Sequence, residues 1–487
     1  MKELCFTFSC VAVSLLFQPS SVLAERQQLP HIVVIMVDDM GYGDPGCFNP
    51  DSKILTPNID SLARDGMRFT DAHAPGPLCH MSRYGLMTGR YPFRADVDSW
   101  RRKRSIAAGQ VTIASLLQDA GYQTAMVGKW HLGFDENGYD KPLPGGPLDC
   151  GFESYFGIRA STDIPPYFYI RGDRAVQPPT NEIAANYSDG WTNIQGAFWR
   201  EGGIAPDLAL KDVLPRFTEE AIGVIQSHRR QPATQQKPLM LYLAYPAPHT
   251  PWLPSKEYAG RSDAGMYGDF ATMVDANVGR ILKSLQETDM AKDTLLVFTS
   301  DNGPVWYEND VERFGHDSSG GLRGMKADAW ECGHRMPFIV RWPGSVAAGT
   351  TSHQTICFTD LLATFSDIVG QTLSSAAGPD SFSFYGVLDG TQPDDAAVRK
   401  QLVMKSGRGL MTIRSGDWKL IQGLGSGGFS EPRKVKPGNG EAIGQLYNLK
   451  DDPAEQHNMY ASRPDVVAAL TAQLDDIQKA RGQRYLK

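Results

Sequence analysis

Apolar runs that end in polar residues mark the N-terminal three quarters of the chain. The run in "HIVVIMVDDMGYGD" ends at Asp38 and Asp39, and "TLLVFTSDNG" ends at Asp301 and Asn302. A third run, "PLMLYLAYPAPHTP", leads to His249. Runs without polar alternation are typical of parallel strands buried on both faces. These segments therefore predict central strands of a parallel sheet, each followed by chemically capable side chains.

Helix-like segments alternate with these strands. One begins at Thr56 and Pro57, a cap residue followed by a proline in the first turn, and another runs from Thr112 to Gly121. Alternating strands and helices predict an α/β fold with a large central, mostly parallel sheet flanked by helices. Ligands of such sheets bind at the carboxyl ends of the strands, where the polar residues named above would gather.

The pattern changes after about Thr391. "MTIRSGDWKLIQG" and "GQLYNLKDDPAEQHN" each predict strand and turn, and "PDVVAALTAQLDDIQKAR" predicts an amphipathic helix. We expect a smaller C-terminal α+β domain containing an antiparallel sheet and a helix. The predicted divisions are a signal peptide over residues 1–24, a large domain over 25–390 and the small domain over 391–487.

Composition narrows the functional classes. The 487 residues are 41% hydrophobic and 21% charged, which is ordinary globular composition, and the formal net charge is −7. An acidic chain argues against nucleic-acid binding, which rewards clustered lysine and arginine. The one basic run, "RRKR" at 101–104, is interpreted as a solvated loop, with contact to an anionic ligand as the alternative.

The N-terminus has the features of a secretory signal peptide. Lys2 precedes an apolar run from Leu4 to Phe17, and the small-residue sequence "SSVLA" ends just before Glu25. We expect a secreted or periplasmic protein, with no later segment apolar enough to span a membrane. Export would leave five cysteines in an oxidising compartment. Since five is odd, one stays unpaired, and Cys79 is the candidate; the pairing of Cys47, Cys150, Cys332 and Cys357 is open.

Three carboxylates at one edge of a sheet predict a cation. Asp38, Asp39, Asp301 and the amide oxygen of Asn302 form an all-oxygen set, which favours Ca²⁺, or Mg²⁺, over zinc. Each of these sequences is also a common turn or cap former, so the alternative is a purely structural role.

The stretch "CHMSRYGLMTGR" predicts a helix that starts near Cys79. Arg83 lies four residues later and would share the helix face with Cys79 near the N-terminus, a favourable place for an anion. A lone Cys79 is otherwise expected to be a small buried hydrophobic residue.

Four motifs in chain order resemble the type I sulfatases of the alkaline-phosphatase-like superfamily, over Ile32 to about Pro343. They are "CHMSRYGLMTGR", "GKWHLG", "SDNG" and "LRGMKADAWECGHRMP", together with the Asp pair after the first strand. The resemblance implies that residues 25–390 are the catalytic domain of a sulfuric ester hydrolase. It further implies that a maturation enzyme oxidises Cys79 to formylglycine, whose hydrate is the nucleophile.

The same resemblance implies the remaining roles. The matured Cys79 would join the four oxygen residues as a ligand of one calcium ion, and Arg83 would steady the hydrate. Lys129 and Lys326 would hold the sulfate, His131 would be the base for sulfate elimination, and His249 would serve the leaving oxygen. An extended segment would direct Lys129 and His131 to the same side.

Three loops are candidates for substrate binding, and two alternative functions stay open. Aromatic and charged loops at 164–174, 189–200 and 305–317 suit a sulfated glycan, with aryl sulfates as further substrates, and 423–429 is expected to be a flexible loop near the cleft mouth. A phosphate or phosphonate ester hydrolase is one alternative. Met81 stands where the family usually has proline, so a catalytically silent binder of sulfated glycans is another.

Overall fold

A computed structural model describes residue 1 and residues 29–232, 234, 236–393 and 395–480. The predicted signal peptide, apart from its first residue, lies outside the described part. No helix among the described residues is both long and apolar enough to cross a membrane.

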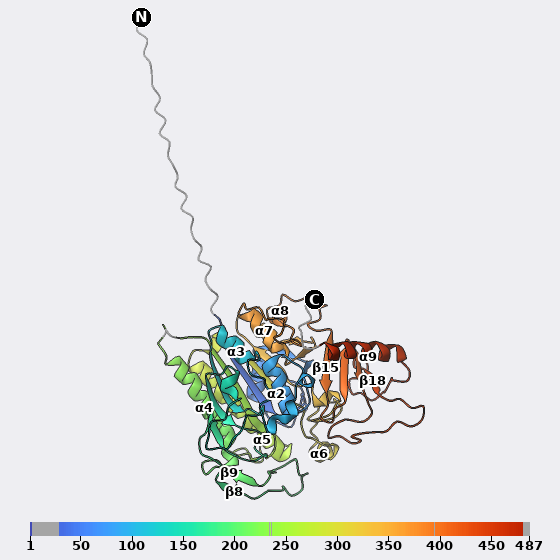
Figure 1. Ribbon diagram of the computed structural model, residues 1–487, viewed down its shortest axis with the longest axis horizontal. Helices are drawn as coiled ribbons and strands as arrows, with labels where there is room; N and C mark the ends of the chain where they lie inside the picture. The colour runs from blue at the N-terminus through green and yellow to red at the C-terminus, as the bar shows by residue number, and fades with distance from the viewer. Residues whose placement is uncertain (2–28, 233, 235, 394, 481–487) are drawn as a thin grey trace.

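The large unit is built on one ten-stranded sheet, which confirms the predicted fold class (Figure 1). The strands are, in spatial order, β13 (Thr350–Ser352), β2 (Met67–Phe69), β12 (Phe338–Arg341), β11 (Thr294–Ser300), β1 (His31–Asp38), β10 (Leu239–Pro248), β4 (Gln123–Lys129), β5 (Ser154–Ile158), β6 (Tyr169–Arg171) and β7 (Arg174–Ala175). The five strands from β11 to β5 are mutually parallel, whereas β12, β6 and β7 pair antiparallel with their inner neighbours. The apolar runs thus form the fully buried centre of the sheet.

Helices pack on the sheet in two groups. One group comprises α1 (Pro57–Arg64), α4 (Val213–Arg229) and α5 (Gly265–Glu287); the other comprises α2 (Cys79–Thr88), α3 (Ile113–Asp119) and α7 (Asp360–Ile368). Thr112 caps α3 with a reciprocal capping box, at the start of the helical segment that the sequence predicts. Thr56 precedes α1 but makes no side-chain cap, because its hydroxyl instead accepts from the Gly46 amide and donates to Asp60.

Short elements complete the large unit. They are the pairs β3 (Ala72–His73) with β14 (Ile356–Cys357) and β8 (Asn181–Ile183) with β9 (Gly202–Ile204), and the helices α6 (Glu308–Phe314) and α8 (Tyr385–Leu388).

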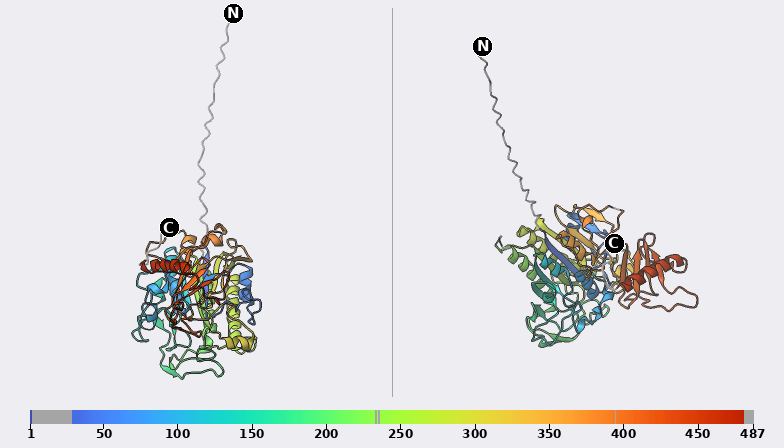
Figure 2. Two further views of the ribbon diagram at one scale, coloured as in Figure 1. Left: turned by 90° about the vertical axis from the view of Figure 1, so that its right-hand side faces the viewer. Right: turned by 45° about the horizontal axis from the view of Figure 1, so that its top comes forward.

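The C-terminal region forms the expected small antiparallel sheet. Its four strands are β15 (Gln401–Lys405), β16 (Met411–Ser415), β17 (Trp418–Ile421) and β18 (Gln445–Asn448), and α9 (Pro464–Lys479) packs on β16 and β17. Figure 2 shows this sheet and helix at one side of the large unit. The exact division at 390/391 stays a prediction.

A buried ionic cluster joins the two regions. The Lys419 ammonium of β17 lies 2.9 Å from both Glu331 and Glu455 and 3.2 Å from the Nε2 atom of His334. His73 contacts His334 through their Nδ1 atoms at 3.0 Å. Although His73, Glu331 and His334 are close enough to share a metal ion, Lys419 already supplies the positive charge there. The cluster therefore fixes the small sheet against the large unit.

Candidate active site

Four adjacent parallel strands deliver the predicted site residues at their carboxyl ends. Asp38 is the last residue of β1 and Lys129 the last residue of β4. His249 directly follows β10, and Asp301 directly follows β11. The edge of the sheet where ligands of α/β folds bind is therefore where these side chains meet.

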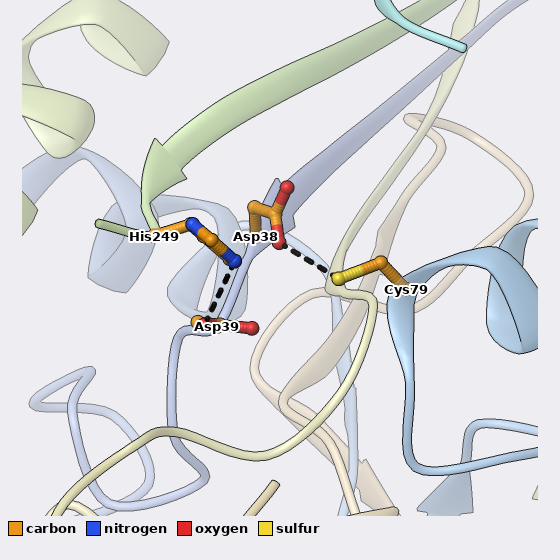
Figure 3. A group of neighbouring side chains, drawn as sticks. All are labelled: Asp38, Asp39, Cys79 and His249. Carbon is orange, nitrogen blue, oxygen red and sulfur yellow. Dashed lines mark hydrogen bonds and ion pairs between the residues drawn. The ribbon is translucent and has the colours of Figure 1, made fainter. Parts of the chain in front are cut away.

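Cys79 enters this edge from a helix. It is the first residue of α2, which ends at the left-handed Gly89, so the predicted helix is confirmed. One ligand atom from each of Asp38, Asp39, Cys79 and His249 lies within 4.8 Å of the others (Figure 3). The Cys79 thiol donates to Asp38 at 3.4 Å. Cys79 is thus placed among acidic side chains, and not within an apolar core.

Each carboxylate of the site is paired with at least one buried cationic side chain. Arg83 donates to Asp301 at 2.7 and 3.1 Å and to Asp38 at 3.3 Å. Lys129 donates to Asp38, and Lys326 donates to both oxygens of Asp39 at 2.6 and 2.8 Å. Three carboxylates thus face three fixed positive charges, all almost completely buried.

The ionisation of the carboxyls follows from these neighbours. Burial opposes ionisation of Asp38, but Lys129, His249 and Arg83 outweigh it and hold its pKa well below the usual value. Burial, and then the charge of Asp38, raises the pKa of Asp301 in spite of Arg83. The positive charges of Arg83 and Lys129 therefore do not fully offset the burial of Asp301 and its repulsion by Asp38.

Asn302 supplies an independent sign of a cation site. Its amide nitrogen donates to Asp39 at 2.6 Å and to the Gly303 carbonyl at 2.9 Å. Its amide oxygen is buried and has no hydrogen-bond partner among the described residues. A free carbonyl oxygen beside three carboxylates is the donor set that Ca²⁺ prefers, so these residues fit a hard cation.

The two histidines differ in their surroundings. His249 donates from Nδ1 to the Thr250 carbonyl at 2.6 Å, because a carbonyl can only accept, and its Nε2 lies 3.6 Å from Asp39. Within the described part of the chain, neither nitrogen of the buried His131 has a hydrogen-bond partner. Burial, followed by the charge of Lys129, holds the pKa of His131 well below the usual value. His131 is therefore neutral near pH 7.

The spacing of Lys129 and His131 predicts an extended segment that directs both side chains to the same side. In the structure, the backbone of His131 is not extended. Its φ of 57° is left-handed, and so are the φ values of Asp39 (64°) and Ala327 (72°). Such backbone strain in residues other than glycine persists where surrounding structure imposes it, and it is frequent at functional sites. The ring packs edge-on against Trp100 at 4.1 Å between centroids.

One cavity of about 250 Å³ joins the site to the surface. The predicted residues that line it are Asp39, Cys79, His131, His249 and Lys326. Each of the three predicted substrate loops contributes to the lining, through Ile164, Ile194 with Arg200, and Val305, and so does Phe429 of the expected mouth loop. Arg101, the first residue of "RRKR", also lines it, which favours the ligand-contact alternative for that arginine.

Ser161, Asp163 and Trp100 line this cavity and were not among the site residues predicted from the sequence. Ser161 and Asp163 are buried in its wall, and each has a side-chain oxygen without a hydrogen-bond partner in the described structure. Trp100 forms another part of the wall. No motif marks these positions, and only the burial of polar atoms reveals them.

All five cysteines after residue 28 are free in the structure, including Cys79.

Comparison with known proteins identifies the family. A Sulfatase family model matches residues 30–371. The chain belongs to the sulfatase family, and its relatives are type I sulfatases, which are sulfuric ester hydrolases.

Individual relatives cover nearly the whole chain. The N-acetylgalactosamine-6-O-sulfatase of Bacteroides thetaiotaomicron is 32% identical over 93% of this chain and 94% of its own length. Human arylsulfatase A is 31% identical over 91% of this chain and 86% of its own length. A solved structure described under the metabolism of multiple glycosaminoglycans by Bacteroides thetaiotaomicron has a TM-score of 0.80 and 30% identity, covering 92% of this chain and 99% of that one. The resemblance found in the sequence motifs is therefore confirmed.

Proposed function

We propose that this sulfatase hydrolyses sulfate esters of glycans, using a nucleophile made by oxidation of Cys79 and one bound calcium ion. The observation that carries the proposal is the position of the Cys79 thiol, 3.4 Å from Asp38 and in one cavity with His131, His249 and Lys326. By resemblance to relatives named for this activity, N-acetylgalactosamine-6-sulfate is the sulfated sugar we propose to test first.

Cys79 needs modification to act at this position. Burial, together with Asp301 and Asp38, raises the pKa of its thiol well above the usual value. A neutral thiol is a poor nucleophile, because the thiolate is the reactive form. Formylglycine would supply a geminal hydroxyl in its place, which explains why a cysteine can occupy so acidic a site.

The charge balance of the site supports a calcium ion. The negative charges of Asp38, Asp39 and Asp301 are matched by the positive charges of Arg83, Lys129 and Lys326. An anionic sulfate ester added to this set would find no surplus positive charge. When bound by Asp38, Asp39, Asp301 and Asn302, calcium would supply that surplus and polarise the sulfate.

The protein side chains then have separate tasks. Lys129, which is paired with Asp38, and Lys326, which is paired with Asp39, hold the sulfate oxygens as charge develops. Arg83 donates to Asp38, the residue that also accepts from the Cys79 thiol, and orients the modified side chain. His249, whose Nδ1 is fixed on the Thr250 carbonyl, presents Nε2 to the leaving oxygen. Neutral His131 accepts the proton that the modified side chain releases when sulfate leaves.

Met81 is compatible with this proposal. It lies in the first turn of α2, where proline is also tolerated, and its side chain is buried. Met81 therefore fills a packing position in the same helical turn as Cys79. We propose that the maturation enzyme accepts it.

The test is mass spectrometry of the peptide that contains Cys79, from protein secreted by its native host, combined with kinetics. A mass decrease equal to conversion of –CH₂SH to –CHO, with reaction toward a carbonyl reagent, supports the proposal. Faster turnover of 4-nitrophenyl sulfate than of 4-nitrophenyl phosphate separates a sulfatase from a phosphatase. An alkylatable thiol in an inactive protein that still binds sulfated glycans would overturn the mechanism in favour of a silent binder.

We further propose that the protein is secreted or periplasmic, on the basis of its N-terminal sequence. N-terminal sequencing of protein recovered outside the cytoplasm should begin near Glu25. A mature chain that begins at Met1 would contradict this proposal.

A further inference from the structure

Asp163 is the most unusual polar residue of the cavity wall. Its side chain is almost completely buried, yet Oδ1 has no hydrogen-bond partner among the described residues. Buried carboxylate oxygens are normally satisfied, because an unpaired one loses its hydration without compensation. An unpaired oxygen in the wall of a substrate cavity therefore points to a group that only the substrate brings.

The orientation of this carboxylate is fixed by Arg200. The guanidinium donates to Oδ2 of Asp163, and its NH1 group also donates to the Asp163 carbonyl at 3.1 Å. The Arg200 backbone amide donates to the same carbonyl at 3.3 Å. One carboxylate oxygen is thus held by Arg200, and the other is left beside the cavity.

The free oxygen lies beside His249. It is 3.9 Å from Nδ1 of His249, but that nitrogen already donates to the Thr250 carbonyl. Lys129 and Lys326, the cations proposed to hold the sulfate, are paired with Asp38 and Asp39, respectively. Because His249 is proposed to serve the leaving oxygen, a bound ester would place its alcohol part next to Asp163.

We propose that Asp163 is a specificity-determining residue, whose free oxygen accepts a hydrogen bond from a hydroxyl of the sugar ring that carries the sulfate. This inference rests on the proposed function and names the part of the substrate that the site recognises. A carboxylate accepts from a hydroxyl and repels a second sulfate or a uronate at the same place. The site thus favours a sugar that is unsulfated at that position, and an aryl sulfate offers no such donor.

The experiment compares two substrates in two variants. The probes are N-acetylgalactosamine-6-sulfate and 4-nitrophenyl sulfate. Asp163→Ala should lower kcat/KM for the sulfated sugar about tenfold to a hundredfold more than for the aryl sulfate, the range expected for loss of a hydrogen bond to a charged group. Asp380→Ala is the matched control, because Asp380 is an equally buried partner of Arg94 that does not line the cavity. It should affect both substrates by the same factor.

Deoxy analogues of the sulfated sugar close the comparison. Removal of the contacted hydroxyl should lower kcat/KM of the unaltered enzyme by the same factor as Asp163→Ala, and should have no further effect in that variant. The proposal would be overturned if Asp163→Ala lowered kcat/KM equally for the sulfated sugar and the aryl sulfate, and if no deoxy analogue had a lower kcat/KM than the sulfated sugar. Asp163 would then act only on His249. Asp163→Asn, which preserves the size of the side chain, gives the same comparison if the alanine variant does not fold.

Failure of the proposed function gives a different result. If the unaltered protein with a modified Cys79 hydrolyses neither probe, calorimetric affinity for the sulfated monosaccharide and its deoxy analogues replaces kcat/KM. A deoxy analogue that binds tenfold more weakly, and only when Asp163 is present, supports Asp163 as the hydroxyl acceptor even then. Identical affinities for all analogues would overturn that role.

Discussion

Substitution of Asp301 by asparagine separates the metal-binding role of this residue from its ion pair. Arg83 NH2 lies 2.7 Å from Asp301 and 3.3 Å from Asp38, so the two carboxylates are at most about 6 Å apart. Their repulsion is then about 3 kcal/mol at an effective dielectric constant near 20. Loss of a buried ion-pair partner costs about 3–5 kcal/mol. The two effects oppose each other, so the free energy of unfolding of the calcium-free Asp301→Asn variant should differ from that of the parent by no more than about 2 kcal/mol.

Calcium binding should stabilise the parent protein more than the Asp301→Asn variant. An ion present at one hundred times its dissociation constant stabilises the folded state by about 2.7 kcal/mol. A chain of 487 residues unfolds with an entropy near 1 kcal/mol/K, so this increment raises Tm by about 3 °C. In Asp301→Asn the site has lost one of its three carboxylates, and the increment at the same calcium concentration should fall below about 1 °C.

Differential scanning calorimetry with calcium and with a chelator measures both increments. Asp269→Asn is the control, because Asp269 is a buried carboxylate that accepts from the Gly260 and Ser262 amides away from the site. It should lower Tm with and without calcium by the same amount. A calcium increment in Asp301→Asn equal to that of the parent would refute the assignment of Asp301 as a calcium ligand.

Four further results are expected. Cys79→Ser should lower kcat on 4-nitrophenyl sulfate by roughly a thousandfold or more, with an unchanged circular dichroism spectrum; undiminished turnover would contradict the formylglycine nucleophile. Lys326→Met should lower kcat by about a hundredfold to a thousandfold in the same assay, because a cation that holds the sulfate is lost. Because the pKa of His131 is lowered, this residue should stay neutral, and kcat should not fall through its protonation as the pH drops through about 6.5. The pH dependence of kcat measures this. An inflection near pH 6.5 that is present in the parent and absent in His131→Gln would contradict the prediction. Lys419→Met should reduce the free energy of unfolding by about 3–5 kcal/mol in denaturant titrations, since Glu331 and Glu455 lose their shared cation; a change as small as that of the exposed Lys450→Met would contradict it.

Local sequence was sufficient for the elements and for most of the site. Buried strands need continuous apolar runs, so β1, β10 and β11 were recognisable, and the polar residues that follow them meet because parallel strands share one edge. The helical spacing of Cys79 and Arg83 placed them together at the start of α2. The family motifs then indicated Lys129, His131 and Lys326, and the structure brings these residues into the same site.

Features that depend on distant contacts could not be predicted. The left-handed backbone of His131 arises at the end of β4, where packing overrides the extended geometry expected from spacing. The hydroxyl of Thr56 bonds to Gly46 and Asp60 and leaves α1 without the expected cap. These outcomes depend on competing partners whose proximity the local sequence does not specify.

The sequence by itself determined which residues are chemically capable and on which elements they lie, because hydrophobic periodicity and short motifs are local properties. Only the tertiary structure decided how their charges pair, since Lys326 and Asp39 are 287 positions apart in the chain. It also decided which polar atoms are buried without a partner. Asp163 looks like any loop aspartate in the sequence, and it becomes a candidate for substrate recognition only because folding buries one of its oxygens in a cavity wall and leaves it unpaired.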